Sequence, residues 1–421
     1  MYKVKEISIN GFWYSLNAKC EFNDNVNIII GRNGTGKTTF MNILHSVLSV
    51  DVDGLADNDF DEVEIKLGYK KRNKTIKVKK IDSTESMFCH VEYQISTKKF
   101  KLRLINQDDH RMPLTYKRRF LEEASLLRNE LDRIVSLSSL SVYRLRNGDD
   151  YEVKSRNGKR TLSPVDYRLS QLKSELTKYQ FELAQKARVI SADLQKDVLA
   201  SILYSGTTDT EISIPKNYDK NIERSNLTSA YTRLNAIDSS IRKKIAFHTS
   251  SIDDAIEIFR KSEGHPDLTE VNFAALEAFV RTKKIIDMSL EAEEKTKLIY
   301  NQIDLFLATL KDFIPEKNFI FESSELLITR TGNNEISSEK LSSGEKQLLI
   351  LLIETLLQKS EPYIYLTDEP ELSLHIEWQR KIIPAVVKLN PNAQVIAATH
   401  SPEIASKFRE KIIDMKSVIY G

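Results

Sequence analysis

The sequence predicts an α/β protein in which a long α-helical insertion interrupts a mostly parallel sheet that also carries an antiparallel lobe. Three observations predict this class. A glycine-rich loop at residues 31–38 lies between an apolar, β-branched run and a segment that can begin a helix. Residues 61–105 hold runs that alternate apolar and polar residues, which is typical of half-exposed antiparallel strands. From about 165 to 312, apolar residues recur at three- and four-residue steps, which is typical of long helices.

Residues 31–38 read Gly-Arg-Asn-Gly-Thr-Gly-Lys-Thr, a complete G-x-x-x-x-G-K-S/T phosphate-binding loop. Its glycines let backbone N–H groups converge on phosphate oxygens, and the following helix N-terminus adds positive potential. Lys37 is expected to reach the β- and γ-phosphates, and the Thr38 hydroxyl is expected to ligate Mg²⁺. The loop therefore predicts a nucleoside triphosphate site. The residues expected to surround the phosphates are Arg32, Asn33, Gly34, Thr35, Gly36, Lys37, Thr38 and Thr39.

Strands are expected in the N-terminal part of the chain and long helices in its middle part. The first 31 residues predict strands that lead into the loop. The antiparallel runs lie at 62–67, 75–79, 90–95 and 100–104, and further strands are expected at 140–143 and 318–330. Long helices are expected at 165–204, 221–262 and 268–311, with linkers at 205–208 and 264–266. No sustained heptad repeat is present in the sequence, so a helical insertion is expected and not an extended coiled coil.

The composition excludes several classes of protein. The chain has 421 residues and a net charge of +2, so any nucleic-acid surface must be a local patch. Its two cysteines, Cys20 and Cys89, provide neither a disulfide framework nor a metal cluster and predict reduced thiols in a cytoplasmic protein. No apolar stretch is long enough to span a membrane, and no apolar signal region is expected at the N-terminus.

A second anion site is predicted before the apolar helix expected at 348–357. Ser342 and Glu345 have the spacing of a capping box, and Gly344 lies between them at the helix N-terminus. Such a terminus, with a glycine at its start, can bind an anion. The alternative is an ordinary, well-capped core helix.

Charged side chains follow two buried strands near the C-terminus. Asp368 and Glu369 follow the apolar run 363–367, at the edge of the sheet where open α/β proteins bind ligands. Asp368 is expected to hold Mg²⁺ through water, and Glu369 is expected to act as a general base on the attacking water. His400 follows the next apolar run, 394–398, and its imidazole is expected to bond the γ-phosphate or the water.

Taken together, these motifs resemble those of an ABC-type ATPase. Residues 31–38, 341–347, 363–370, 371–375 and 398–401 resemble its Walker A, signature, Walker B, D-loop and H-loop segments. Their order and the long intervening segment are similar to the branch that contains SMC, RecF and OLD proteins. The resemblance implies that ATP and Mg²⁺ are the ligands.

The resemblance also implies a division of the chain and an oligomer. The N-terminal half of the ATPase head would span 1–160, the α-helical insertion 161–315, and the C-terminal half of the head 316–421. In this branch the signature of one protomer faces the Walker A loop of another. Ser342, Ser343 and Gly344 would therefore contact the nucleotide of a second copy in at least a head-to-head dimer.

Within that branch, Glu371-Leu372-Ser373-Leu374-His375 and the segment after Ala398 resemble ATPases of anti-phage systems and OLD nucleases. OLD proteins append a Toprim nuclease, which is not expected here because the sequence ends at Gly421. The resemblance is therefore to the stand-alone PtuA ATPases of Septu-type defence, which imply a separate HNH nuclease as partner, with the ATPase of the PARIS system as runner-up. Two other functions stay open, a RecF-like DNA repair ATPase and an ATP-locked scaffold with little turnover.

Two features of the sequence leave alternatives open. The branch has a Q-loop glutamine near the end of its antiparallel lobe, and Gln94 and Gln107 are the candidates, while 141–144 contain none. Two basic clusters could contact DNA phosphates, one at 70–74 continued by Lys77, Lys79 and Lys80, and one at 116–120. Alternatively, the first is a solvated hairpin whose lysines protect a sheet edge from pairing.

Overall fold

The computed structural model describes residues 1–81, 90–104, 114–139, 151–155, 158–202, 218–233, 236–261, 272–330 and 335–421. It separates into two compact units. The first unit comprises Met1–Lys178 together with Ile303–Gly421, and the second comprises Tyr179–Gln302. The proposed domain limits 1–160, 161–315 and 316–421 stay predictions.

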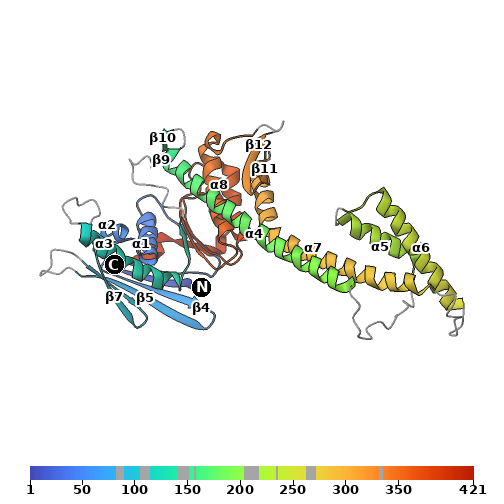
Figure 1. The fold of residues 1–421 in the computed structure, drawn as a ribbon. Helices are drawn as coiled ribbons and strands as arrows, with labels where there is room; N and C mark the ends of the chain where they lie inside the picture. The colour runs from blue at the N-terminus through green and yellow to red at the C-terminus, as the bar shows by residue number, and fades with distance from the viewer. Residues whose placement is uncertain are drawn as a thin grey trace. The chain divides into compact units, whose positions relative to one another are not determined.

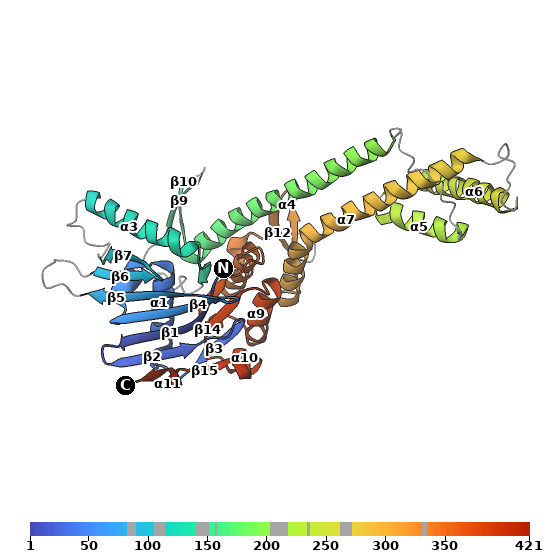
Figure 2. The same cartoon turned by 90° about the horizontal axis from the view of Figure 1, so that it is seen from below.

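The first unit contains a parallel sheet whose order is β15-β3-β14-β13-β8. Figure 2 labels its strands β3, β14 and β15. All its neighbouring pairs are parallel. Its strands are β3 (Val26–Ile30), β8 (Leu137–Ser139), β13 (Ile364–Asp368), β14 (Gln394–Ala398) and β15 (Ile412–Asp414). Every residue of β13 and β14 is buried, which explains their continuous apolar runs.

An antiparallel sheet in the same unit has the order β16-β2-β1-β4-β5-β6-β7. Figure 1 labels its strands β4, β5 and β7, and Figure 2 shows β7, β6, β5, β4, β1 and β2 in this order. Its strands are β1 (Lys3–Phe12), β2 (Leu16–Glu21), β4 (Glu62–Tyr69), β5 (Arg72–Ile81), β6 (His90–Ile95), β7 (Lys98–Arg103) and β16 (Ile419–Tyr420). Buried residues alternate with partly buried or exposed ones along β4 and with partly buried ones along β6, which confirms the period-two prediction for 61–105. The predicted strand at 140–143 lies outside the described residues.

Helix α1 (Lys37–Ser49) packs against both sheets. Its buried side chains, among them Phe40 and Leu44, belong to one apolar cluster with residues of β4, β5, β13 and β14. The Tyr93 hydroxyl in β6 donates to the Val47 carbonyl, which ties the end of the helix to the antiparallel sheet. The core therefore holds the start of α1 at the carboxyl edge of the parallel sheet.

Smaller elements complete this unit. These are the hairpins β9 (Tyr151–Ser155) with β10 (Gly158–Leu162) and β11 (Lys317–Glu322) with β12 (Glu325–Arg330), the helices α2 (Val52–Asp57), α3 (Leu114–Asp132), α8 (Ser343–Leu357), α9 (Ile376–Leu389), α10 (Pro402–Ser406) and α11 (Met415–Val418), and the 3₁₀ turns η2 (Ser338–Lys340) and η3 (Arg409–Lys411). The strand prediction for 318–330 is confirmed as the β11–β12 hairpin. The structure thus has the fold class expected, an ABC-type α/β head with a helical insertion.

The second unit is helical. It contains α5 (Lys220–Arg233), α6 (Ser239–Lys261) and parts of α4 (Pro164–Ile202) and α7 (Phe273–Phe313). The stretch predicted as one helix at 221–262 is two, because α5 ends at Arg233 and α6 begins at Ser239. The predicted linkers at 205–208 and 264–266 lie outside the described residues. Within the described part of the chain, no helix is both long and apolar enough to cross a membrane.

Candidate functional site

The phosphate loop connects the buried strand β3 to α1, as its sequence requires. Gly34 and Gly36 have φ values of 79° and 87°, a conformation that residues with a side chain rarely adopt. A Cβ atom on Gly36 would lie 2.9 Å from Phe12 and 3.1 Å from Trp13, so this glycine also admits close packing of the β1–β2 turn. This aromatic contact with the loop was not predicted from the sequence.

Lys37 lies over its own loop. Its side chain is buried, and Nζ donates to the Gly31 carbonyl at 2.8 Å and to the Arg32 carbonyl at 3.2 Å. Burial lowers the pKa of Lys37, while the carboxylates of Asp368, Glu369 and Glu371 act in the opposite direction. The ammonium group can exchange these two bonds to carbonyl groups for stronger ones to phosphate oxygens.

Thr38 and Asp368 connect the loop to the end of β13. The Thr38 hydroxyl donates to Asp368 Oδ2 at 2.8 Å, although the two residues lie far apart in the sequence. Asp368 pairs with Ala398 across β13 and β14, and Ala398 pairs with Ile29 across β14 and β3. The parallel register therefore brings these residues to one edge of the sheet. A hydroxyl and a carboxylate at hydrogen-bonding distance are oxygen donors of the kind that bind Mg²⁺.

Glu369 and His400 lie beside this pair. Glu369 has a φ of 50°, and its N–H donates to the Ala398 carbonyl at 2.8 Å, so the chain turns sharply after β13. His400 Nε2 lies 3.8 Å from Glu369 Oε1, and both side chains are partly exposed. The left-handed backbone of a glutamate is strained, and such strain is concentrated at functional sites. The structure thus brings together Lys37, Thr38, Asp368, Glu369 and His400.

The signature residues form a separate feature at the start of α8. Ser342 is the N-cap, its side chain accepts from the Glu345 N–H, and the Glu345 carboxylate accepts from the Ser342 N–H at 2.9 Å, which confirms the predicted capping box. Ser342 and Ser343 are exposed. Glu345 also forms an ion pair with Lys317. Burial favours the neutral form of Glu345, but the hydrogen bonds from Lys317 and Ser342 outweigh it, and its pKa is lowered.

Gly344 packs directly on the segment after β13. A Cβ atom on this glycine would lie 2.5 Å from the Ser373 carbonyl oxygen, too close for any side chain. The signature helix and the 371–375 segment are therefore in backbone contact within one chain. This contact also makes Gly344 a poor position for testing phosphate contacts, because its substitution would displace Ser373.

Of the remaining predicted positions, some lie within the residues that the structure describes and others lie outside them. Gln94 lies in β6, where its Nε2 donates to the Ser96 carbonyl in the β6–β7 turn at 2.9 Å. Gln107 and 141–144 lie outside the described residues, as does Cys89. The cluster 116–120 is helical in α3, with side chains outside the described set.

The lysines of the antiparallel sheet are largely paired. Lys66 lies 3.0 Å from Glu6, Lys77 lies 2.6 Å from Glu64, and Lys101 lies 3.2 Å from Glu92 on neighbouring strands. Lys70 and Lys74 at the hairpin turn lie over the rings of Tyr69 and Tyr2. Lys77, which continues the first basic cluster, is thus paired within the sheet. β4 and β5 are interior strands of this sheet, so the lysines of their hairpin do not protect a sheet edge, contrary to the alternative prediction.

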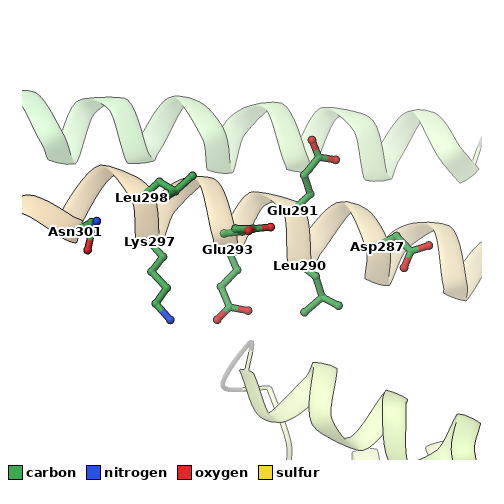
Figure 3. A pocket seen from close by; sticks show the side chains of 8 residues that line it. Asp287, Leu290, Glu291, Glu293, Lys297, Leu298 and Asn301 are labelled. Atoms are coloured by element: carbon green, nitrogen blue, oxygen red, sulfur yellow. The ribbon is translucent and has the colours of Figure 1, made fainter.

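A hollow of about 900 Å³ runs along α7 in the second unit (Figure 3). Four carboxylates line it, together with Leu290, Lys297, Leu298 and Asn301. The carboxylates belong to Asp287, Glu291, Glu293 and Glu294. Such a lining repels phosphate, so this hollow is not a candidate for the nucleotide.

Comparison with known proteins identifies several similarities. A profile of the AAA ATPase domain family matches residues 2–405. The chain is 34% identical over 144 residues to the retron Ec83 probable ATPase of Escherichia coli, a match that covers 29% of this chain and 27% of that protein. It is 30% identical over 175 residues to the retron Vc95 probable ATPase of Vibrio cholerae serotype O1 biovar El Tor, covering 36% and 34% of the two chains.

The chain is also 35% identical over 91 residues to Septu protein PtuA of Bacillus thuringiensis, covering 18% of this chain and 23% of that protein. The matches thus span about a third or less of the curated relatives. Among solved structures, the Smc head domain of Pyrococcus furiosus aligns with 98% of this chain and 93% of its own at 12% identity and a TM-score of 0.41. Similarity this low adds nothing to what the motifs indicate.

Proposed function

This chain belongs to the AAA ATPase domain family, and from that premise we propose that it is a cytoplasmic ATPase that hydrolyses ATP between two copies of itself. The 2.8 Å hydrogen bond between Thr38 and Asp368 carries this proposal. It joins the phosphate loop to the acidic end of β13, and hydrolysis requires both parts at one place.

Each residue of the cluster has a defined task. Lys37 neutralises the β- and γ-phosphates, and the loop N–H groups orient them. Thr38 directly and Asp368 through water would hold Mg²⁺, which would supply charge neutralisation at the phosphates. Glu369 accepts a proton from the attacking water, and His400 donates a hydrogen bond to the γ-phosphate or orients that water.

The second copy contributes the signature. Ser342 and Ser343 are exposed at a capped helix N-terminus, which favours phosphate binding from outside the chain. The hydrogen bonds described for Ser342 go to Glu345 and to the Lys346 N–H of the same helix, and none of them goes to the phosphate loop of the same chain. We infer that ATP holds two heads together, with each signature on the nucleotide of the other copy.

We further propose that this assembly belongs to an anti-phage defence complex and controls a separate nuclease, of HNH type by resemblance to PtuA. The similarity to Septu protein PtuA and to the retron ATPases supports the defence role. The proposed docking region is an exposed face of the helical insertion at roughly 165–312. Exposed apolar side chains support it, namely Phe181, Val189, Leu199, Ile222, Phe247 and Leu298.

The purified chain is expected to leave DNA intact, because cleavage is assigned to the partner. Linear and supercoiled DNA should be incubated with Mg²⁺ or Mn²⁺ and ATP, with and without the product of the open reading frame adjacent to this gene. Cleavage is expected only with both proteins, and it should be lost with Lys37→Ala.

The same incubations distinguish two other outcomes when ATP hydrolysis is measured alongside DNA cleavage. A strong increase of ATP turnover on adding DNA, without any cleavage, would favour the RecF-like alternative. Cutting by the chain alone, abolished by a substitution in it outside the ATP site, would refute the partner proposal.

A further inference from the structure

One carboxylate oxygen binds three consecutive residues around His400. Glu371 Oε1 accepts hydrogen bonds from the Thr399 hydroxyl at 2.7 Å, the His400 N–H at 2.8 Å and the Ser401 N–H at 3.1 Å. Glu371 follows β13, and its partners follow the neighbouring parallel strand β14. The glutamate thus connects the two strand ends that carry the proposed base and the proposed histidine.

The loop that Glu371 holds is fixed on its other sides as well. The Thr399 N–H donates to the Ile29 carbonyl at 3.0 Å, and its hydroxyl accepts from the Ser401 N–H at 2.9 Å. The Ser401 hydroxyl donates to Gln379 Oε1 at 2.7 Å. Thr399 and Ser401 are buried, whereas His400 is exposed and its imidazole lies 3.8 Å from Glu369. Glu371 therefore holds the backbone from which the His400 imidazole projects.

Glu371 lies close enough to the nucleotide site for its charge to act on Lys37. Its charge is one of three that oppose the effect of burial on the pKa of Lys37. Its second oxygen, Oε2, is buried and has no hydrogen-bond partner within the described residues. Since Oε1 already accepts three hydrogen bonds, Glu371 is suited to hold groups in place and poorly suited to take a proton from water.

We propose that Glu371 is a positioning residue for ATP hydrolysis, which holds the 399–401 backbone so that the His400 imidazole meets the γ-phosphate. This inference rests on the proposed ATPase function. It assigns to Glu371 a task that depends on one acceptor oxygen and not on negative charge. Glutamine keeps that oxygen, whereas alanine removes it.

The test compares Glu371→Gln, Glu371→Ala and wild type in steady-state ATP hydrolysis. We expect kcat to fall by about 10- to 100-fold in Glu371→Ala, with KM for ATP changed by less than about twofold, as for other residues that orient a reacting group. Glu371→Gln should stay within about threefold of wild type. Glu377→Ala, an exposed carboxylate of the neighbouring helix α9, is the matched control and should match wild type.

A double-mutant cycle with His400→Ala separates positioning from a general effect on folding. If Glu371 acts through His400, Glu371→Ala should cost little more once His400 is absent. The inference would be overturned if Glu371→Ala lowered kcat in the His400→Ala background by the same factor as in the wild type. Wild-type turnover in His400→Ala would also overturn it. Equal loss in Glu371→Gln and Glu371→Ala would also overturn it, because the charge would then be the active feature.

The same data distinguish failure of this inference from failure of the proposed function. Absence of turnover in the wild-type protein would refute the ATPase proposal itself. Normal turnover in the wild type and in Glu371→Ala would refute only the role of Glu371. Thermal unfolding midpoints of the variants, together with their affinities for ATP, check that the head is folded in each.

Discussion

Replacing Lys37 with alanine is expected to abolish ATP binding, with a Kd at least about 100-fold weaker than that of the wild type. Lys37 is the buried cation of the phosphate loop, and its ammonium group is placed to leave the Gly31 and Arg32 carbonyls for the phosphates. Hydrogen bonds to charged groups contribute about 1.5–3 kcal/mol each, and a loss of about 3 kcal/mol corresponds to roughly 100-fold in affinity. Isothermal titration calorimetry with Mg²⁺·ATP measures this directly.

A surface lysine of the same head provides the control for Lys37→Ala. Lys381 lies in α9 and forms an exposed ion pair with Asp312 at 3.1 Å. Its replacement by alanine should leave ATP affinity unchanged, because it is not part of the phosphate loop. An unchanged affinity in Lys37→Ala would show that residues 31–38 are not the nucleotide site.

Glu369→Gln is expected to bind ATP with near wild-type affinity but to hydrolyse it about 100- to 1,000-fold more slowly. The substitution removes the proposed general base and preserves its size, and general-base catalysis typically contributes about 10²- to 10⁴-fold. The N–H of residue 369 still reaches the Ala398 carbonyl, so the turn after β13 should persist. Single-turnover hydrolysis with protein in excess over labelled ATP measures the chemical step without product release.

The two glutamates of this segment form a matched pair for that measurement. Glu369→Gln should be slow and Glu371→Gln should be active, although both substitutions are isosteric and lie two residues apart. Wild-type rates in Glu369→Gln would place the base elsewhere. Equal slowing in both would indicate that the segment needs its total charge and not one specific base.

Local motifs were predictable because each needs only neighbouring residues. The loop 31–38 and the Ser342–Glu345 capping box depend on spacing within one turn or one helix end, and the capping box is confirmed. The apolar runs before Asp368 and His400 were sufficient to predict buried strands with polar ends. The period-two runs were likewise sufficient to predict β4 to β7.

Features that depend on pairing between distant segments were not predictable. The hydrogen bonds from Thr399 and His400 to Glu371 exist because β13 and β14 are parallel neighbours. No local sequence pattern indicates which strands lie side by side. The Lys66–Glu6 pair likewise requires β4 to lie beside β1. The approach of Gly344 to Ser373 depends on how α8 packs, and the glycine alone is consistent with a phosphate contact.

The most direct test of the composite ATP site is a crosslink between two differently tagged chains. Cys20 and Cys89 are first replaced by alanine in both. One chain then carries Ser15→Cys, in the exposed turn whose Trp13 contacts Gly36, and the other carries Lys340→Cys, two residues before Ser342. Glu369→Gln in both chains keeps ATP bound, and a flexible bis-maleimide joins cysteines that come close.

We predict a crosslink between the two chains that requires ATP and is lost when the Lys340→Cys chain also carries Ser343→Arg. The arginine side chain would occupy the exposed N-terminus of α8, where the phosphate of the other chain's ATP is expected. The same chain should still bind ATP at its own phosphate loop. Glu339→Arg adds the same cation at an exposed neighbouring position and should leave the crosslink intact. An ATP-dependent crosslink that persists with Ser343→Arg, or no crosslink with ATP in any pair, would contradict the head-to-head site.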